Sequence, residues 1–421
     1  MPLRDRPSRR PAGSARALAG AVLLASSPTA VLADAADGPA GSEPRVGTAE
    51  GPKPTPTDAQ RLPLEPVRTY ATVGRPIAVA VDRSAFVAGG PEPRIELIDP
   101  LPGRTIAGET LAGLDEPAPG DRPDEPVRVD LGELFPGLRS PGEARVLYAQ
   151  LNRGGERLGP PVVLRPLVTP RVSTDALTGE LGAALRRRDA PLLARLLELA
   201  SEELEPMRER VVVRSPRGET VAGRRLDVLR RYVFETDRGV LEFRPEPAHA
   251  PNTTLHVRRL IEGGFYGGSP FHRIIPTDTL GRPFLVQTGD PTGTGLGTAG
   301  VFVDFEPSDL PHRFGTLSLA RRPDDPNSGS SQLMITLGRE GGRSLDGGYT
   351  SFARLVRGSE ALLAIASWDA EPAAGAAGAD TEPEPEPEPR PTIVRAWTVP
   401  AEPFGLGPAR ELGPETPRPE R

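Results

Sequence analysis

The first stretch with a regular hydrophobic pattern lies between residues 67 and 170. Short β-prone apolar runs separated by Gly/Pro turns recur there; they are 76–82, 94–99, 127–135, 144–151 and 161–168. This length and spacing are typical of strands in a small antiparallel sandwich. We therefore predict a β-rich, sandwich-like domain over 67–170. Residues 34–66 before it are rich in Pro, Gly, Asp and Glu and lack an apolar period, which predicts a disordered linker.

The hydrophobic period changes to that of a helix after residue 170. Leucines recur at near 3.6-residue spacing through 173–211, and Ser173 or Asp175 is placed to cap the first turn. Pro191 divides the stretch into two predicted helices. A leucine stripe of this kind is usually a packing face, so we predict a helical connector over 173–230.

Short strands return from residue 231 onward. The pattern predicts two strands within 232–245 around a tight turn at 236–239, then strands in 269–276, 284–290, 315–321, 327–337 and 344–356. Only two helices are predicted: 250–266, capped by Asn252 or Thr253 and stopped by Gly263-Gly264, and 359–368. Many strands with few helices favour an antiparallel β-barrel with helices at its ends, here over 231–399.

Composition limits the function classes. The 421 residues include 52 prolines and 47 glycines, so part of the chain is linker. The net charge is −6 and the arginines form no runs, which argues against a nucleic-acid surface. Cysteine is absent, so the chain has no disulfide and no thiol chemistry. His249, His256 and His312 lack close metal-ligand pairing, and we expect no metal and no cofactor.

The N-terminus resembles a targeting segment. A basic stretch is followed by the apolar run 17–33, which ends in Val31-Leu32-Ala33, a small-residue cleavage pattern. This predicts a signal peptide over 1–33 and an exported protein, periplasmic or associated with the cell envelope. A disordered Ala-rich tail and an uncleaved anchor are the alternatives. Arg9-Arg10 leaves the export route open, and no other stretch is apolar enough to cross a membrane.

Several motifs then occur in one order and together carry a family resemblance. They are F-H-R-I-I-P at 271–276, F-L-V-Q-T-G-D at 284–290, G-T-L-S-L-A-R at 315–321, S-S-Q-L-M-I at 330–335 and S-L-D-G at 344–347. In this order they resemble the cyclophilin-type peptidyl-prolyl cis-trans isomerases, in particular bacterial members. The resemblance covers 232–368, with 391–399 similar to the family's closing strand. It implies an eight-stranded antiparallel barrel capped by two helices, with a shallow proline pocket on its outer face.

The residues fit this chemistry independently. Rotation about an X–Pro amide faces a barrier of roughly 18–20 kcal/mol because resonance holds the amide planar. A permanently charged donor beside an apolar pocket favours the twisted state, and Arg273 is the candidate donor with Gln287 as its partner. The alternatives are that Arg273 is a structural arginine paired with Asp290 and that Gln287 only satisfies a strand edge.

The resemblance also implies the substrate-binding residues. They are His272, Phe284, Leu285, Ala320, Arg321, Met334, Leu345 and Tyr349. His272 is expected to support the site without acting as a base, since isomerisation transfers no proton. The sequence departs from the family where Leu333 and Met334 replace two phenylalanines, Ser344 replaces an aromatic residue and Tyr349 replaces histidine. Residues 277–283 form a longer loop than the family's usual short link.

Two further low-complexity segments complete the chain. Residues 369–391 contain alternating Glu-Pro and are predicted to be an acidic spacer, and 400–421 a disordered tail. The sequence favours an isomerase that acts on proline-containing segments of exported proteins. A catalytically weak proline-binding or scaffold module is the alternative, and a main function in the N-terminal half stays open, as does an envelope protein partner for 67–170.

Overall fold

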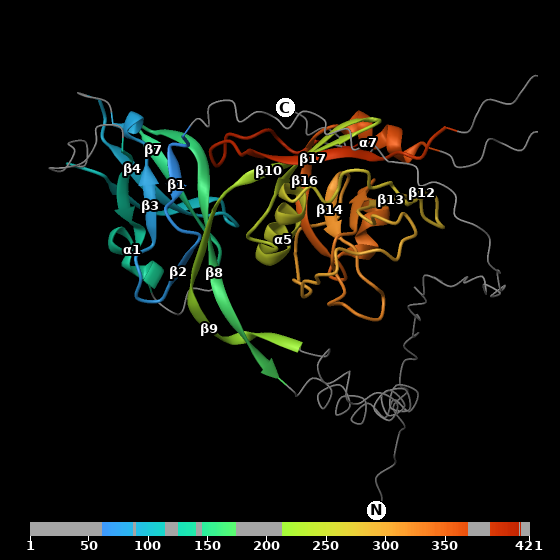
Figure 1. The fold of residues 1–421 in the computed structure, drawn as a ribbon, viewed down its shortest axis with the longest axis horizontal. Coiled ribbons are helices and arrows are strands. Elements are labelled where there is room, and N and C mark those ends of the chain that lie inside the picture. The colour runs from blue at the N-terminus through green and yellow to red at the C-terminus, as the bar shows by residue number, and fades with distance from the viewer. Residues whose placement is uncertain are drawn as a thin grey trace, which may run out of the picture. The chain divides into compact units, whose positions relative to one another are not determined.

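The structure is a computed structural model that describes residues 61–86, 90–113, 125–139, 145–173, 213–368, 388–411 and 413. Figure 1 shows the course of these residues. The predicted signal peptide, the linker up to residue 60, the leucine-rich helices within 174–212 and the spacer 369–387 lie outside the described residues. No helix among those described is long and apolar enough to cross a membrane.

Two antiparallel sheets form the N-terminal part and confirm that it is rich in β structure. One sheet has the order β1 (Leu64–Pro66), β3 (Ala78–Val81) and β6 (Val127–Asp130). The other has the order β2 (Tyr70–Thr72), β9 (Val213–Val228), β8 (Glu156–Ser173), β7 (Leu147–Arg153), β4 (Pro93–Asp99) and β5 (Arg104–Thr110). Residues of both sheets, among them Leu64, Val79, Leu147 and Leu164, share one buried apolar cluster.

The structure corrects four sequence expectations. The predicted strand 127–135 ends at Asp130, because the Asp130 carboxylate accepts the Gly132 amide hydrogen at 2.8 Å and starts the short helix α1 (Leu131–Leu134). The predicted helical connector is wrong over 213–228, which forms β9 and pairs along β8. The predicted linker already contains β1 at its end. The predicted disordered tail is wrong over 401–411, where Ala401 is buried and the Phe404 amide donates to Gln150 Oε1 at 3.0 Å.

The second part is an eight-stranded antiparallel half-barrel, in agreement with the predicted strand number. Its order is β12 (Arg273–Thr277), β13 (Pro283–Thr288), β15 (Leu333–Thr336), β14 (Thr316–Leu319), β16 (Thr350–Arg357), β11 (Gly239–Pro245), β10 (Arg230–Thr236) and β17 (Ile393–Pro400). A short antiparallel bridge joins the residues before β12 to the start of β17. In it the Gly268 and Phe271 amides donate to the carbonyls of Ile393 and Pro391, each at 2.8 Å, and the Ile393 amide donates to the Ser269 carbonyl at 2.9 Å.

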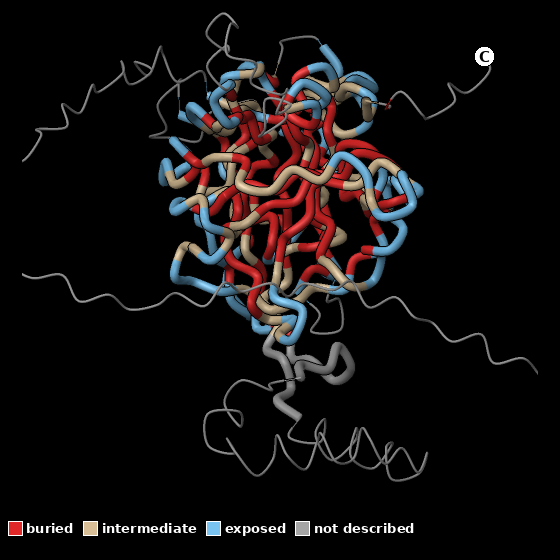
Figure 2. Tube along the Cα trace, turned by 90° about the vertical axis from the view of Figure 1, so that its right-hand side faces the viewer, coloured by how far each residue is buried: buried red, intermediate tan, exposed pale blue. Residues whose placement is uncertain are grey.

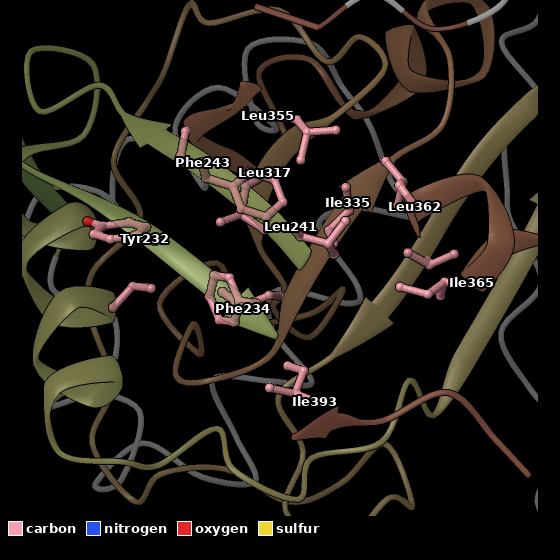
Figure 3. Close-up of a cluster of buried hydrophobic side chains, with 14 of the residues drawn as sticks. Tyr232, Phe234, Leu241, Phe243, Leu317, Ile335, Leu355, Leu362, Ile365 and Ile393 are labelled. Atoms are coloured by element: carbon pink, nitrogen blue, oxygen red, sulfur yellow. The ribbon is translucent and has the colours of Figure 1, made fainter. Parts of the chain in front are cut away.

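The half-barrel encloses an apolar core. Tyr232, Phe234, Phe243, Leu317 and Ile335 converge from four strands, β10, β11, β14 and β15 (Figure 3). Figure 2 shows the buried residues gathered in the interior and the exposed ones around it. The two predicted helices are present: α5 (Pro251–Glu262) and α7 (Ser359–Ala366) add buried residues to the same core. Further short helices are α6 (Arg339–Gly342) and the 3₁₀ turns η1 (Arg83–Ala85), η2 (Pro136–Arg139) and η3 (Arg343–Leu345).

The cap of α5 differs from the prediction. Neither Asn252 nor Thr253 is the N-cap; Ala250 is, and it offers no side-chain acceptor. The Glu306 carboxylate instead accepts the Asn252 and Thr253 amide hydrogens at 2.9 and 2.7 Å. A capping group 54 residues away in sequence satisfies the free amides of the first turn, which a local motif could not indicate.

A buried ionic cluster joins β8, β9 and α5. Asp227 on β9 accepts from Arg165 Nε on β8 at 2.7 Å and from Arg258 Nη1 on α5 at 3.2 Å. Arg165 Nη1 also donates to the Pro251 carbonyl and to Thr254 Oγ1, at 2.8 and 2.9 Å. Arg165 is 5 % exposed and Asp227 8 %, so this cluster holds the N-terminal sheet to the half-barrel through desolvated charge pairs.

Candidate active site

One row of residues crosses four strands on the outer face of the half-barrel. Arg273 on β12 lies opposite Gln287 on β13, Gln287 opposite Met334 on β15, and Met334 opposite Ser318 on β14. Directly opposed residues of an antiparallel sheet project to the same face. The neighbouring row Ile274, Val286, Ile335 and Leu317 packs on the inner core instead. The alternation of the strands therefore places the candidate chemistry outside the core.

A separate apolar cluster lies beside this row. Leu285, Ala320, Met334 and Leu345 are buried together, and the half-buried Phe284 and Tyr349 pack against them. These six residues all belong to the predicted substrate-binding set and come from β13, β15, the end of β14, where Ala320 is the next residue, and the segment 343–349. We call them the apolar pocket. The structure thus brings together residues spread over 66 positions of the sequence, from Phe284 to Tyr349.

Arg273 is not paired with Asp290, the partner that the structural alternative named. Within the described residues it forms no ion pair and no side-chain hydrogen bond, although it is half-buried at the start of β12. Asp290, its predicted alternative partner, instead accepts from the amide and hydroxyl of Thr292, both at 2.7 Å, and from the Gly295 amide at 2.5 Å. The Arg273 guanidinium therefore has free donors, on the face of the sheet that carries Gln287 and Met334 of the apolar pocket.

Gln287 is held by a residue that the sequence reasoning missed. Gln287 is buried, and its Nε2 donates to Gln332 Oε1 at 2.7 Å. Gln332 Nε2 in turn donates to the carbonyls of Gly295 and Gly297, each at 2.9 Å. This chain of bonds fixes the Gln287 amide and ties the glycine-rich loop 291–302 to the pocket. The signal was present, because Gln332 stands directly before β15 in the S-S-Q motif.

His272 is not part of the apolar pocket. Its ring lies against Gly295 of the glycine-rich loop, where a Cβ would approach the ring carbon Cδ2 to 3.7 Å. Both ring nitrogens are buried without a hydrogen-bond partner among the described residues. Burial lowers the pKa of His272, and the nearby Arg390 and Arg273 lower it further, while Asp290 opposes them. A neutral ring at neutral pH agrees with a supporting role.

The rim of the pocket is fixed by Arg321 and Asp346. Arg321 Nε donates to the Gly348 carbonyl at 2.8 Å, and its guanidinium carbon lies 4.8 Å from the centre of the Tyr349 ring. Asp346 accepts from the His312 amide at 2.9 Å and from Arg339 Nη1 at 2.6 Å. These contacts hold the segment that carries Leu345 and Tyr349.

The loop between β12 and β13 does not extend the apolar pocket. Thr277 pairs with Pro283, so the two strands continue into the loop. The Asp278 carboxylate closes it by accepting from the amides of Leu280 and Arg282, at 2.9 and 3.0 Å. Leu280 at the tip is 72 % exposed and is not a member of the pocket.

The contribution of Asp290 to the stability of the fold depends on pH. Burial by itself would raise the pKa of Asp290, but hydrogen bonds from Thr292, Gly297 and Gly295 outweigh it and lower the pKa to about 2. A carboxyl with a lowered folded-state pKa stabilises the fold above its unfolded pKa, and this stability is lost as pH falls from about 4 to about 2. We expect the urea midpoint of the wild type to fall over this range.

An Asp290→Asn variant should show a smaller fall, because Asp346, whose pKa is also lowered, still contributes to it, and should be less stable at pH 7 by about 1–2 kcal/mol. Urea titrations of both proteins at pH 7, 4 and 2 measure the difference. Asp324→Asn is the control, because Asp324 is exposed and forms no ion pair within the described residues. Equal pH dependence in wild type and Asp290→Asn would contradict this role of Asp290.

Comparison with known proteins gives one family. Residues 231–396 match the family model of cyclophilin type peptidyl-prolyl cis-trans isomerase/CLD. Peptidyl-prolyl cis-trans isomerase-like 1 of Emericella nidulans is 40 % identical over 130 residues, which are 30 % of this chain and 74 % of that protein. A peptidyl-prolyl cis-trans isomerase of Synechococcus elongatus is 38 % identical over 122 residues, 29 % of this chain and 77 % of that protein.

Among solved structures, a cyclophilin type isomerase of Cryptosporidium parvum, crystallised in the presence of the dipeptide Ala-Pro, is 26 % identical with a TM-score of 0.33. The match covers 40 % of this chain and 98 % of that chain. Through the domain in residues 231–396, the chain belongs to the cyclophilin family of peptidyl-prolyl cis-trans isomerases.

Proposed function

We propose that this domain accelerates X–Pro rotation in exported proteins, with Arg273 stabilising the twisted amide. The observation that carries the proposal is the Arg273 guanidinium, half-buried next to the apolar pocket and free of any carboxylate among the described residues. A charge that is partly desolvated and not neutralised interacts strongly with a polarised substrate.

The pocket residues supply complementary roles. Phe284, Met334 and Leu345 give an apolar surface on which a proline ring can be buried. Twisting the amide breaks the conjugation between nitrogen and carbonyl, so the nitrogen lone pair becomes a better acceptor and Arg273 can donate to it. Gln287, held by Gln332, is placed to orient the substrate backbone. No bond is broken and no proton is transferred, so the site needs no general base.

The place of action is also a proposal. The basic and apolar pattern of residues 1–33 supports export, and the two N-terminal sheets are proposed to position the isomerase domain or its substrates in the envelope. Sequencing the N-terminus of the protein recovered from its native cells tests this. A mature chain that starts near Asp34 supports export, and one that retains residue 17 contradicts cleavage.

A proline-binding module without useful turnover is the second candidate. Met334 in place of an aromatic residue gives a softer pocket wall, since the unbranched thioether side chain is flexible. The hydroxyl of Ser344 donates to the Gly341 carbonyl at 2.8 Å and so is already occupied. Both features reduce the contacts available to a substrate.

One experiment separates the two candidates. The full-length chain is added to an X–Pro test peptide, and the cis-to-trans rate and the dissociation constant are both measured. We expect isomerisation to be much faster than the uncatalysed reaction, which takes tens of seconds or longer. Peptide binding without acceleration of isomerisation would identify a recognition module. The absence of both binding and acceleration would refute the proposed function.

A further inference from the structure

Arg321 brings a second positive charge to the rim of the pocket. It follows Ala320 of the apolar pocket and is half-buried. Its Nε donates to the Gly348 carbonyl at 2.8 Å, and its Nη1 donates to the carbonyls of Arg322 and Pro323, at 2.8 and 3.2 Å. These partners and the Tyr349 ring are uncharged, and within the described residues no carboxylate pairs with Arg321. The contacts hold the guanidinium in place without neutralising it.

The carboxylates around the pocket are already bound by other groups. Asp346 is held by His312 and Arg339, and Asp290 by the amides of its own loop. Asp325 accepts from the Asn327 amide at 2.9 Å and from Arg322 at 3.4 Å, and Asp278 from Arg282 at 2.8 Å. Asp324, on the same turn as Arg322, is exposed to solvent and does not pair with Arg321 in the described structure.

Arg273 and Arg321 are therefore half-buried cations near the pocket that have no acidic partner among the described residues. The charge of Asp324 makes the electrostatic potential near Arg321 less positive, but the effect is small because water and salt screen an exposed carboxylate. A half-buried, fixed guanidinium is screened less and is ready to accept a carboxylate from a ligand.

A bound peptide can reach both cations. Arg273 is on β12, which lies three strand spacings from β14, and Arg321 follows β14, three residues beyond Ser318 in the row that contains Arg273. Spacings of about 4.8 Å between strands and 3.3 Å between residues put the two backbone positions roughly 17 Å apart. An extended peptide of about five residues covers this distance, with its proline over the apolar pocket between them.

We propose that Arg321 is a specificity-determining residue that makes the site prefer prolyl peptides with an acidic side chain within two residues of the proline. The inference rests on the proposed function and names its substrate class. Half-exposed ion pairs are weak individually, so we expect about a fivefold preference for Glu over Gln in kcat/KM, which falls as salt is raised.

The test uses the full-length chain and pairs of peptides that differ only by Glu or Gln, scanned over the two positions on each side of one proline. Turnover and dissociation constants are measured for the wild type, Arg321→Met and Arg321→Lys. Methionine keeps an apolar stem and removes the charge, whereas lysine keeps the charge. Arg357→Gln is the matched control, since Arg357 is exposed at the far end of β16.

For each variant we compare kcat/KM for the Glu peptide with kcat/KM for the matching Gln peptide. A general loss of activity, caused by a change in the structure around the pocket, lowers both values and leaves their ratio unchanged. We expect the preference at one or more positions in the wild type, in Arg321→Lys and in Arg357→Gln, and a ratio near one in Arg321→Met. A ratio within twofold of one at every position in the wild type, or an undiminished preference in Arg321→Met, would overturn the inference.

The salt dependence of the wild-type ratio gives a check that needs no variant to fold. A preference that stays constant between low and high salt would speak against an ionic contact. The outcomes also separate the inference from the proposed function. If peptides bind with the Glu preference but are not turned over, the isomerase proposal fails and the inference stands. If they are turned over without a charge preference, the inference fails and the isomerase proposal stands.

Discussion

Replacing Arg273 by alanine is expected to lower kcat/KM for an X–Pro peptide by about a hundredfold or more. The loss is large because Arg273 is the charged residue of the row Arg273, Gln287 and Met334. Removing one donor of this kind from a site typically lowers the rate by about 10²–10³. Stopped-flow measurement of cis-to-trans isomerisation by the full-length protein gives the value. The fold should be retained, because Arg273 pairs with no other side chain in the described structure.

Two further variants make this result specific. Arg273→Lys keeps a positive charge but loses the planar fork, so an intermediate rate is expected. Arg357→Ala removes an exposed arginine from the same sheet and should leave the rate unchanged. If Arg273→Ala turns over peptide as fast as Arg357→Ala, Arg273 is not the centre of catalysis.

Replacing Asp227 by asparagine is expected to lower the free energy of unfolding by about 3–5 kcal/mol. The change leaves two arginines, Arg165 and Arg258, without their shared carboxylate, and an unpaired charge in a buried site is costly. Urea unfolding followed by tryptophan fluorescence measures the effect. The two tryptophans, Trp368 and Trp397, both belong to the half-barrel part, so a change in their transition reports that Asp227 stabilises it from β9.

Asp324→Asn is again the matched control, because it removes one carboxylate from an exposed turn and should change the stability by less than about 0.5 kcal/mol. A double variant, Arg165→Met with Asp227→Leu, removes the most buried pair together, while Arg258 keeps Glu262 as a partner at 2.7 Å, and should recover much of the lost stability. If Asp227→Asn unfolds like the wild type, the cluster does not hold the two parts together.

The fold could be predicted where local patterns and long-range pairing agree. The strands of the half-barrel could be predicted because short apolar runs such as 284–286 stand between turn residues, although Leu285 and Val286 are both apolar and face opposite sides of the sheet. The strand β9 could not be predicted, because its many arginines and glycines are poor local evidence for a strand and its pairing with β8 decides the structure. Glu306, as the distant cap of α5, is another case in which tertiary contacts override local sequence.

The candidate site could be predicted in its members but not in its bonds. The motif order placed Arg273, Gln287 and six pocket residues, and the structure brings them together. Sequence spacing could not show whether the Asp290 carboxylate pairs with Arg273 or accepts from amides of its own loop, because both partners are near in sequence. The structure shows the second arrangement, with the Thr292 and Gly295 amides as donors. The Gln287–Gln332 bond was missed because the two amides are 45 residues apart and meet only once β13 and β15 pair.

The single-residue offset between the outer and inner rows couples catalysis to strand alignment. Arg273, Gln287 and Met334 face outward only while β12, β13 and β15 keep their register, and Ile274, Val286 and Ile335 stand one position away. A slip of one residue would turn the guanidinium and the amide into the core and expose the aliphatic side chains. Molecules with misaligned strands would therefore be inactive and prone to aggregate. The isomerase activity recovered during refolding then measures the fraction of molecules whose strands are correctly aligned.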